Sequence, residues 1–215
     1  MRPLRHLKPR YIWDRLVEKR FRANHPGLPW LDPTAISLLE TLLRREDCGL
    51  EFGSGRSTLW FSARTSTLTS IEHNREWYEQ EKTLLAEKHC ENVNLLHFPL
   101  DAMEEGIPVY ARAAESFPAA SLDYVLIDGV HRDFCASLSL DRIAPGGMLI
   151  IDNVHLYFPN QSRAPNAVPQ DGQPVSKIWL EVFQQISNWR HIWTSNGISD
   201  TAIYFKPGGI RQTIV

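Results

Sequence analysis

The sequence predicts a doubly wound α/β domain with a mostly parallel, seven-stranded sheet whose last strand is antiparallel. N-terminal helices are predicted to precede this domain. Short apolar runs alternate with amphipathic stretches from Cys48 onward, which is typical of a parallel sheet covered by helices. The 215 residues are 43% hydrophobic and 22% charged, enough to build one large core. The turn formers Asn196 and Gly197 separate the last two apolar runs, which indicates an antiparallel pair.

The N-terminal segment is expected to form two helices. The apolar residues of the first recur at helical spacing, at Trp13, Leu16, Val17 and Phe21, with arginines and lysines on the other face. Asp32 is a predicted N-cap and Pro33 the first residue of the second helix. We therefore divide the chain into a basic helical extension, residues 1–45, and a main domain, residues 46–215.

The main domain is expected to alternate strands and helices in chain order. The predicted strands are 48–52, 67–72, 93–98, 123–128, 147–152, 190–195 and 201–206. The predicted helices are 57–64, 74–89, 108–115, 131–142 and 176–187. Residues 157–175, with four prolines, form the one long irregular segment, and a loop of this length is usually functional or disordered.

Charge is unevenly distributed along the chain. Residues 1–26 carry eight basic and two acidic side chains, so a net charge of −2 leaves −8 on the remainder. An acidic body argues against general nucleic-acid binding. The basic arm suggests peripheral contact with an anionic partner surface or a neighbouring subunit, or else it packs Trp13, Leu16 and Phe21 on its own domain.

The sequence also indicates a cytoplasmic protein. No apolar run approaches the length of a membrane span, and the first residues lead into no signal-peptide core. The three cysteines, Cys48, Cys90 and Cys135, form no C-x-x-C pair that would suggest zinc or a disulfide framework. A reducing compartment fits this cysteine usage best.

A glycine turn after the first strand is the strongest local motif. Gly53 and Gly55 allow the backbone to turn sharply and to approach a ligand. A dinucleotide fingerprint would place a third glycine where Thr58 stands, and Glu51 has the wrong sign for a pyrophosphate. The carboxylate suits a cationic ligand such as S-adenosylmethionine. Glu72, which ends the second strand, can accept hydrogen bonds from ribose hydroxyls, or it only complements a helix dipole.

Taken together, these motifs resemble those of the class I S-adenosylmethionine-dependent methyltransferases, which have a Rossmann-like fold. The resemblance runs from Cys48 to Lys206 and includes Asp128 after the fourth strand, Ala144-Pro-Gly-Gly147 before the fifth, and the closing hairpin 189–206. It implies that the cofactor is held by Glu51, Gly53, Ser54, Gly55 and Glu72, with Asp101 near the adenine.

A second group of polar residues is expected at the ends of the fourth and fifth strands. His131 is the predicted general base for methyl transfer to a hydroxyl, with Asp128 beside it, although His131 could simply cap a helix. Asp128, Asp152 and Asn153 are similar to the oxygen ligands of cation-dependent O-methyltransferases, and such donors suit Mg²⁺. The alternatives are a plain strand-end turn, or a charged His131 or an arginine such as Arg132 that pairs with one carboxylate.

The leading functional hypothesis is a methyltransferase acting on a hydroxyl of a small molecule or glycan. The alternatives are an NAD-linked oxidoreductase or epimerase and a methyltransferase-like binding module without activity. Tyr157 and Phe158 are assigned to the acceptor pocket. Tryptophans 60, 77, 179 and 193 are expected to pack the core.

Overall fold

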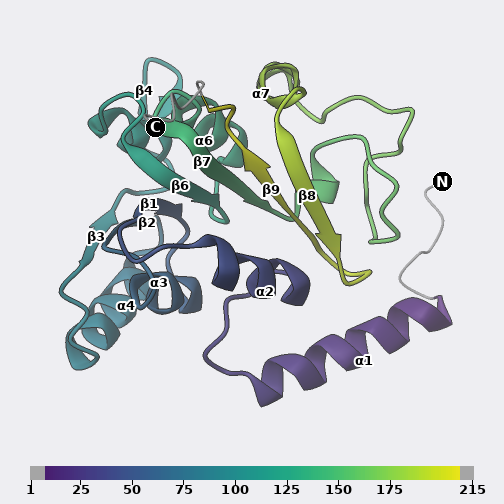
Figure 1. Cartoon of the computed structure of the whole chain (residues 1–215), viewed down its shortest axis with the longest axis horizontal. Coiled ribbons are helices and arrows are strands. Elements are labelled where there is room, and N and C mark those ends of the chain that lie inside the picture. The colour runs from purple at the N-terminus through teal and green to yellow at the C-terminus, as the bar shows by residue number, and fades with distance from the viewer. Residues whose placement is uncertain (1–7, 209–215) are drawn as a thin grey trace, which may run out of the picture.

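The computed structural model describes residues 8–208, and its centre is one seven-stranded sheet with the strand order β3-β2-β1-β6-β7-β9-β8 (Figure 1). Strand β9 is antiparallel to both of its neighbours, whereas the pairs among β3, β2, β1, β6 and β7 are parallel. The strand bounds are β1 Cys48–Phe52, β2 Thr67–Glu72, β3 Val93–His97, β6 Leu122–Ile127, β7 Ile143–Asp152, β8 Arg190–Ser195 and β9 Asp200–Phe205. The predicted sheet is confirmed.

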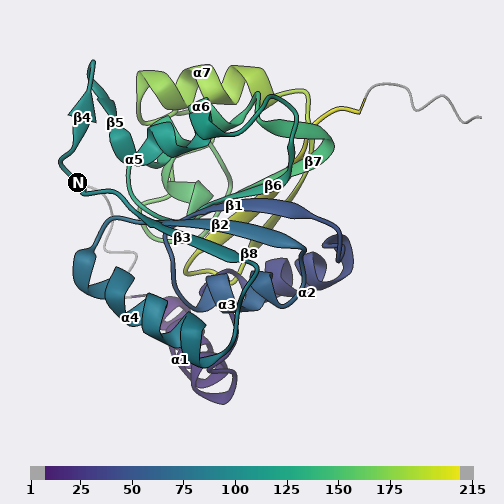
Figure 2. The same ribbon diagram turned by 90° about the vertical axis from the view of Figure 1, so that its left-hand side faces the viewer.

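Helices cover both faces of the sheet (Figure 2). One face carries α2 (Pro33–Leu42), α3 (Arg56–Ser62) and α4 (Arg75–Glu87), and the other carries α5 (Val109–Arg112), α6 (Arg132–Ser139) and α7 (Lys177–Ile186). The central strands supply apolar residues to both layers: Tyr124 and Leu126 belong to one core cluster and Val125 and Ile127 to the other. This two-sided burial explains why the strands read as continuous apolar runs.

The second predicted helix begins where its cap signal places it. The Asp32 side chain accepts hydrogen bonds from the backbone N–H groups of Thr34 (2.9 Å) and Ala35 (3.2 Å), which satisfies two donors of the first turn. Ala35 and Leu39 are then fully buried against the sheet. Helix α2 is thus part of the layer that covers the sheet.

Several short elements depart from the predicted pattern. The predicted helix 108–115 is divided into α5 and a 3-10 turn at Ala113–Ser116, and it follows a small hairpin formed by β4 (Met103–Glu104) and β5 (Ile107–Pro108). A second 3-10 turn covers Val154–Leu156. The long irregular segment is anchored to the domain, since Val168 donates a backbone hydrogen bond to His155 (2.8 Å) and is buried.

The first helix, α1 (Pro9–Asn24), has no buried residue and lies apart from the layered body in Figure 1. The alternative that Trp13, Leu16 and Phe21 pack on the domain is wrong for the first two, because Trp13 is 66% exposed and Leu16 is 58% exposed, whereas Phe21 is half-buried. Polar contacts attach it instead: the Arg22 guanidinium donates to the carbonyls of Pro29 (2.6 Å) and Leu31 (3.0 Å). Arg2 and Arg5 of the predicted basic arm lie outside the described residues.

None of the helices within residues 8–208 combines the length and the apolar character that a membrane span requires.

Candidate active site

The glycine turn after β1 packs directly against the turn after β6. Gly53 has φ +98°, a conformation that favours glycine, and a Cβ atom at this position would lie 2.8 Å from the Gly129 Cα. Backbone hydrogen bonds fix the two turns, because Gly53 donates to Ile71 (2.9 Å) and Asp128 donates to Phe52 (3.0 Å). Gly129 was not singled out in the sequence, and the V-L-I-D-G context after a buried strand is the signal that could have identified it.

Glu51 lies inside the domain, beneath the glycine turn. It has no exposed surface, and its Oε2 accepts hydrogen bonds from the hydroxyls of Thr58 and Ser70, both at 2.6 Å. Thr58 also accepts the Gly55 backbone N–H (2.9 Å), so the residue in the third-glycine position holds the turn through its hydroxyl. Burial raises the pKa of Glu51 to about 7. Its Oε1 has no hydrogen-bond partner among the described residues.

Glu72 closes over the glycine turn from the end of β2. One carboxylate oxygen accepts hydrogen bonds from the Ser54 backbone N–H and hydroxyl, both at 3.2 Å, and the other accepts from the Asn74 N–H at 2.7 Å. The expectation that Trp77 packs in the core is wrong, because Trp77 is 46% exposed. Its indole N–H donates a hydrogen bond to the Ser54 carbonyl at 2.8 Å. Trp77 therefore contacts the glycine turn, which the sequence did not reveal.

His131 and the segment after β3 are brought together by the fold. The Nε2 atom of His131 lies 3.1 Å from the carbonyl oxygen of Leu100, and the neighbouring Asp101 is exposed in a turn. His131 precedes α6 with φ +47°, and Asn153 follows β7 with φ +52°. A left-handed backbone is uncommon for residues other than glycine and is enriched at functional sites.

The ends of β6 and β7 are joined by one guanidinium group. Arg132 donates to a carboxylate oxygen of Asp128 at 3.0 Å, to the Asp152 carbonyl at 2.7 Å and to the Asn153 side-chain oxygen at 3.2 Å. It also donates to the backbone carbonyls of Gly129 and Asp128, both at 2.8 Å. The arginine and Asp128 are largely buried, so this contact is shielded from solvent.

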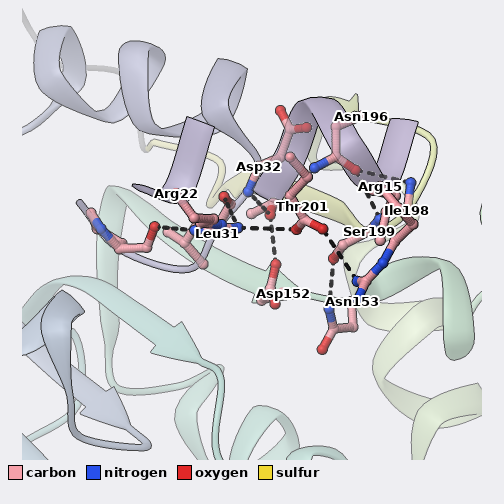
Figure 3. A network of polar contacts seen from close by, with 12 residues as sticks. Arg15, Arg22, Leu31, Asp32, Asp152, Asn153, Asn196, Ile198, Ser199 and Thr201 are labelled. Atoms are coloured by element: carbon pink, nitrogen blue, oxygen red, sulfur yellow. Dashed lines mark hydrogen bonds and ion pairs between the residues drawn. The ribbon is translucent and has the colours of Figure 1, made fainter. Parts of the chain in front are cut away.

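Asp152 is linked to the N-terminal segment rather than to solvent (Figure 3). Its Oδ1 accepts the Thr201 hydroxyl at 2.7 Å, and that hydroxyl accepts the Asp32 backbone N–H at 3.1 Å. Burial raises the pKa of Asp152, and the negative charge of Asp128 raises it further. Burial also raises the pKa of Asp128, which the Arg132 charge opposes. These directions favour a protonated Asp152 beside an ionised Asp128 paired with Arg132.

The magnesium site predicted from Asp128, Asp152 and Asn153 is not supported. Arg132 takes the Asp128 carboxylate and the Asn153 oxygen as its acceptors, and Asp152 is turned toward Thr201. A cation is thus already provided by the chain, and the donor set does not fit a divalent ion. Within residues 8–208, no group of three or more His, Cys, Asp or Glu side chains could hold a metal.

The other residues considered for the site have mixed outcomes. Phe158 is fully buried and belongs to the core, so its assignment to the acceptor pocket is wrong. Tyr157 is half-buried and stacks on Trp179 with the ring centroids 4.8 Å apart. His155 is buried and accepts the Asp200 N–H (3.2 Å), a structural contact. His73 lies 3.0 Å from Glu72 through its Nδ1 atom.

Comparison with known proteins agrees with this geometry. Residues 50–154 match a family model described as a methyltransferase domain. No curated protein sequence matches the chain significantly.

Solved structures share its fold at low sequence identity. A candidate caffeoyl-CoA O-methyltransferase from Staphylococcus aureus superposes with a TM-score of 0.57 at 19% identity, covering 88% of this chain and 90% of that one. A methyltransferase-like protein from Silicibacter pomeroyi has a TM-score of 0.54 at 20% identity, covering 86% and 91%. A candidate methyltransferase from Streptococcus mutans, solved in complex with SAH, has a TM-score of 0.55 at 13% identity, covering 81% and 98%.

The family match covers the segment that contains the glycine turn, Glu72 and Asp128, which follows β6. The strand order and the reversed β9 extend the agreement to the end of the sheet. Residues 50–154 therefore form a methyltransferase domain, and the chain has the fold of the S-adenosylmethionine-dependent methyltransferases.

Proposed function

We propose that this protein transfers a methyl group from S-adenosylmethionine to a hydroxyl of a small molecule or glycan. The observation that carries the proposal is the placement of His131 at the ligand-binding edge of a methyltransferase sheet. Methyl transfer to oxygen requires a hydroxyl that loses its proton, and an imidazole is suited to accept it near neutral pH.

The hydrogen bond of His131 leaves one ring nitrogen available. A carbonyl oxygen only accepts hydrogen bonds, so Nε2 donates to Leu100. In the neutral ring the lone pair is then on Nδ1, which can accept a proton from a hydroxyl. The fixed Nε2 contact also restricts rotation of the ring, which helps to position a base.

The residues of the glycine turn fit the cofactor. The close approach of Gly53 to Gly129 provides a turn without side chains, and Glu72 offers a carboxylate whose contacts with Ser54 are long, at 3.2 Å. We assign Gly53, Ser54, Gly55 and Glu72 to cofactor binding, with Glu51 and Asp101 as further candidates. The unpartnered Oε1 of Glu51 would need the turn to shift before it met a cationic group, because Glu51 is fully buried. Bound S-adenosylmethionine would supply the electrophilic methyl group.

We propose that Arg132 stabilises the charges at the ends of β6 and β7, where Asp128, His131, Asp152 and Asn153 form what we call the catalytic edge. It keeps Asp128 ionised beside the cofactor turn, while Asp152 stays protonated and acts as a neutral neighbour. Asp128 thereby retains a negative charge near the site without requiring a metal ion. His131 remains the proton acceptor in this scheme.

Binding measurements with the purified protein test the cofactor assignment. Native mass spectrometry identifies any co-purifying nucleotide, and isothermal titration with S-adenosylmethionine, SAH and NAD measures the preference. We expect micromolar binding of the first two, about 10⁻⁶ M. Tighter binding of NAD would favour the oxidoreductase hypothesis, although the buried Thr58 in the third-glycine position argues against it.

Turnover requires a separate assay. Transfer of labelled methyl groups to an array of phenols, catechols and glycans would identify the acceptor class. Binding of S-adenosylmethionine without transfer to any nucleophile, including amines and thiols, would instead favour an inactive binding module. Transfer to amines alone would contradict the proposed hydroxyl specificity.

The partner and location proposals follow from the same features. The three cysteines are free thiols, which fits a reducing cytoplasm. The acceptor is proposed to be a small molecule or glycan, because the acidic body outside the N-terminal arm disfavours nucleic acid.

A further inference from the structure

Helix α1 presents an apolar face to solvent that the rest of the domain does not cover. Exposed fractions are 50% for Ile12, 66% for Trp13, 58% for Leu16 and 51% for Val17. These positions follow the i, i+4 spacing of one helix side, so they form a continuous stripe. Exposed apolar stripes of this kind usually mark an interaction site.

The charges on α1 are sorted between its two sides. Both of its acids, Asp14 and Glu18, are half-buried on the inward side. Glu18 lies 3.5 Å from Arg22, whose guanidinium is bonded to the segment that leads into α2. Lys19 and Arg20 are exposed and, at 100° per residue, lie on the same side as Leu16 and Trp13. The outward face therefore combines apolar and cationic side chains without an acid.

The position of α1 is fixed by close contacts with the body. Asp14 of α1 packs directly against Gly197 in the turn between β8 and β9, since a Cβ atom added at Gly197 would lie 2.6 Å from the Asp14 carboxylate. The same hairpin contacts the catalytic edge, because the Asn153 side-chain amide donates to the Ser199 hydroxyl at 2.6 Å. The helix is thus held with its apolar stripe outward, close to the edge of the sheet that contains Asn153.

We propose that the outward face of α1 docks on an anionic lipid bilayer. An exposed helix side with an indole, aliphatic side chains and interspersed cations matches the pattern of helices that lie in a membrane interface. The negative body would be repelled from such a surface, so the basic helix determines which side approaches it. Docking would turn the hairpin side of the catalytic edge toward the bilayer. The proposal does not depend on the methyl acceptor.

Vesicle co-sedimentation of the full chain tests the proposal. Vesicles of roughly three parts phosphatidylcholine to one part phosphatidylglycerol are compared with phosphatidylcholine alone at low and high salt. We expect binding to the anionic vesicles only, weakened by salt. The double variant Trp13→Ser/Leu16→Ser should reduce the partition coefficient at least about tenfold. Lys19→Glu/Arg20→Glu should reduce it about thirtyfold or more, since each basic residue contributes about fivefold near such a surface.

Matched controls use exposed residues elsewhere. Met103→Ser/Val175→Ser removes two apolar side chains that are also more than half exposed, and Lys82→Glu/Lys88→Glu reverses two exposed charges on or beside α4. These variants should bind as the wild type does. Urea unfolding checks that the α1 variants retain their stability, as expected for exposed positions.

Two results would overturn the proposal. The first is equal binding by the α1 variants and the wild type, or equal binding to neutral and anionic vesicles. The second is a protein that ignores vesicles but has twice the mass of one chain by light scattering, and becomes monomeric on Trp13→Ser/Leu16→Ser. That result would assign the stripe to a second copy of the chain.

Discussion

The two halves of the candidate site are built in different ways. The β1–β2 half is assembled from residues close in sequence: Thr58 bonds Glu51, and Glu72 bonds Ser54. The β6–β7 half also depends on contacts across long stretches of chain, from Asp32 through Thr201 to Asp152. Both halves need paired strands, but only the second also depends on the N-terminal segment and on the hairpin of β8 and β9.

This difference also separates two kinds of buried carboxylate. Glu51 is fully buried, contacts neutral hydroxyls and has no ion-pair partner among the described residues, so its neutral form is favoured. Asp128 is paired with a guanidinium and shares its surroundings with a second acid. We therefore expect pH and bound ligand to have the main effect on the stability of the β1–β2 half. Loss of one charge should have the main effect on the stability of the β6–β7 half.

The largest effect is expected for His131→Ala. Loss of a general base should lower the methyl-transfer rate by about 10²- to 10⁴-fold, while cofactor affinity stays nearly constant because the glycine turn is untouched. The assay is single-turnover transfer to the acceptor found in the screen, and His89→Ala, at an exposed position remote from the turn, serves as the control. An unchanged rate would remove His131 from the mechanism.

Arg132→Met tests the long-range half. Removing the cation leaves Asp128 buried without its partner, and we expect a loss of about 3–5 kcal/mol in the free energy of unfolding at pH 8. The loss should be smaller at pH 5, because carboxyl groups with raised pKa values are then largely protonated in the folded state.

Adding Asp128→Asn to Arg132→Met should recover part of the lost stability, since it removes the uncompensated charge. Urea denaturation of the four proteins in this cycle measures the coupling. Additive effects would show that Arg132 and Asp128 do not stabilise each other.

The pH dependence of stability tests Glu51. Its pKa rises from 4.5 to about 7 on folding, so the folded state takes up a proton between these values. Stability from this group is present below pH 4.5 and is lost as pH rises through 7, by about 3 kcal/mol. Glu51→Gln should flatten this part of the curve. Parallel curves for the variant and the wild type would contradict the assignment.

Glu72→Ala should weaken binding of S-adenosylmethionine about tenfold to one hundredfold, since a hydrogen bond to a charged group contributes about 1.5–3 kcal/mol. Glu76→Ala is the matched control, because Glu76 is exposed in the first turn of α4. Isothermal titration compares the three proteins. Unchanged affinity would leave Glu72 with a purely structural role on Ser54 and Asn74.

The smallest effect is expected for metal removal. Because Arg132 already supplies the positive charge at the β6–β7 edge, EDTA treatment should leave methyl transfer unchanged. Activity that disappears with EDTA and returns with magnesium would restore the metal hypothesis. Arg132 would then have to move away from Asp128.

The sequence predicted the sheet almost strand by strand because burial on both faces leaves continuous apolar runs, as at Leu122–Ile127. The Asp32 cap was predictable for a local reason, since its partners are two and three residues away. The division of residues 108–115 was not, because short helical turns depend on packing more than on periodicity.

The sequence by itself determined the glycine turn, the carboxylate at the end of β2 and the pair of acids at the ends of β6 and β7. Only the tertiary structure decided what those groups contact. Arg132 occupies the place predicted for a metal because α6 begins directly beside β7, and Trp77 reaches Ser54 because α4 starts next to the glycine turn. Likewise, helical periodicity identified the apolar face of α1, but whether that face meets the body depends on how the helix is attached.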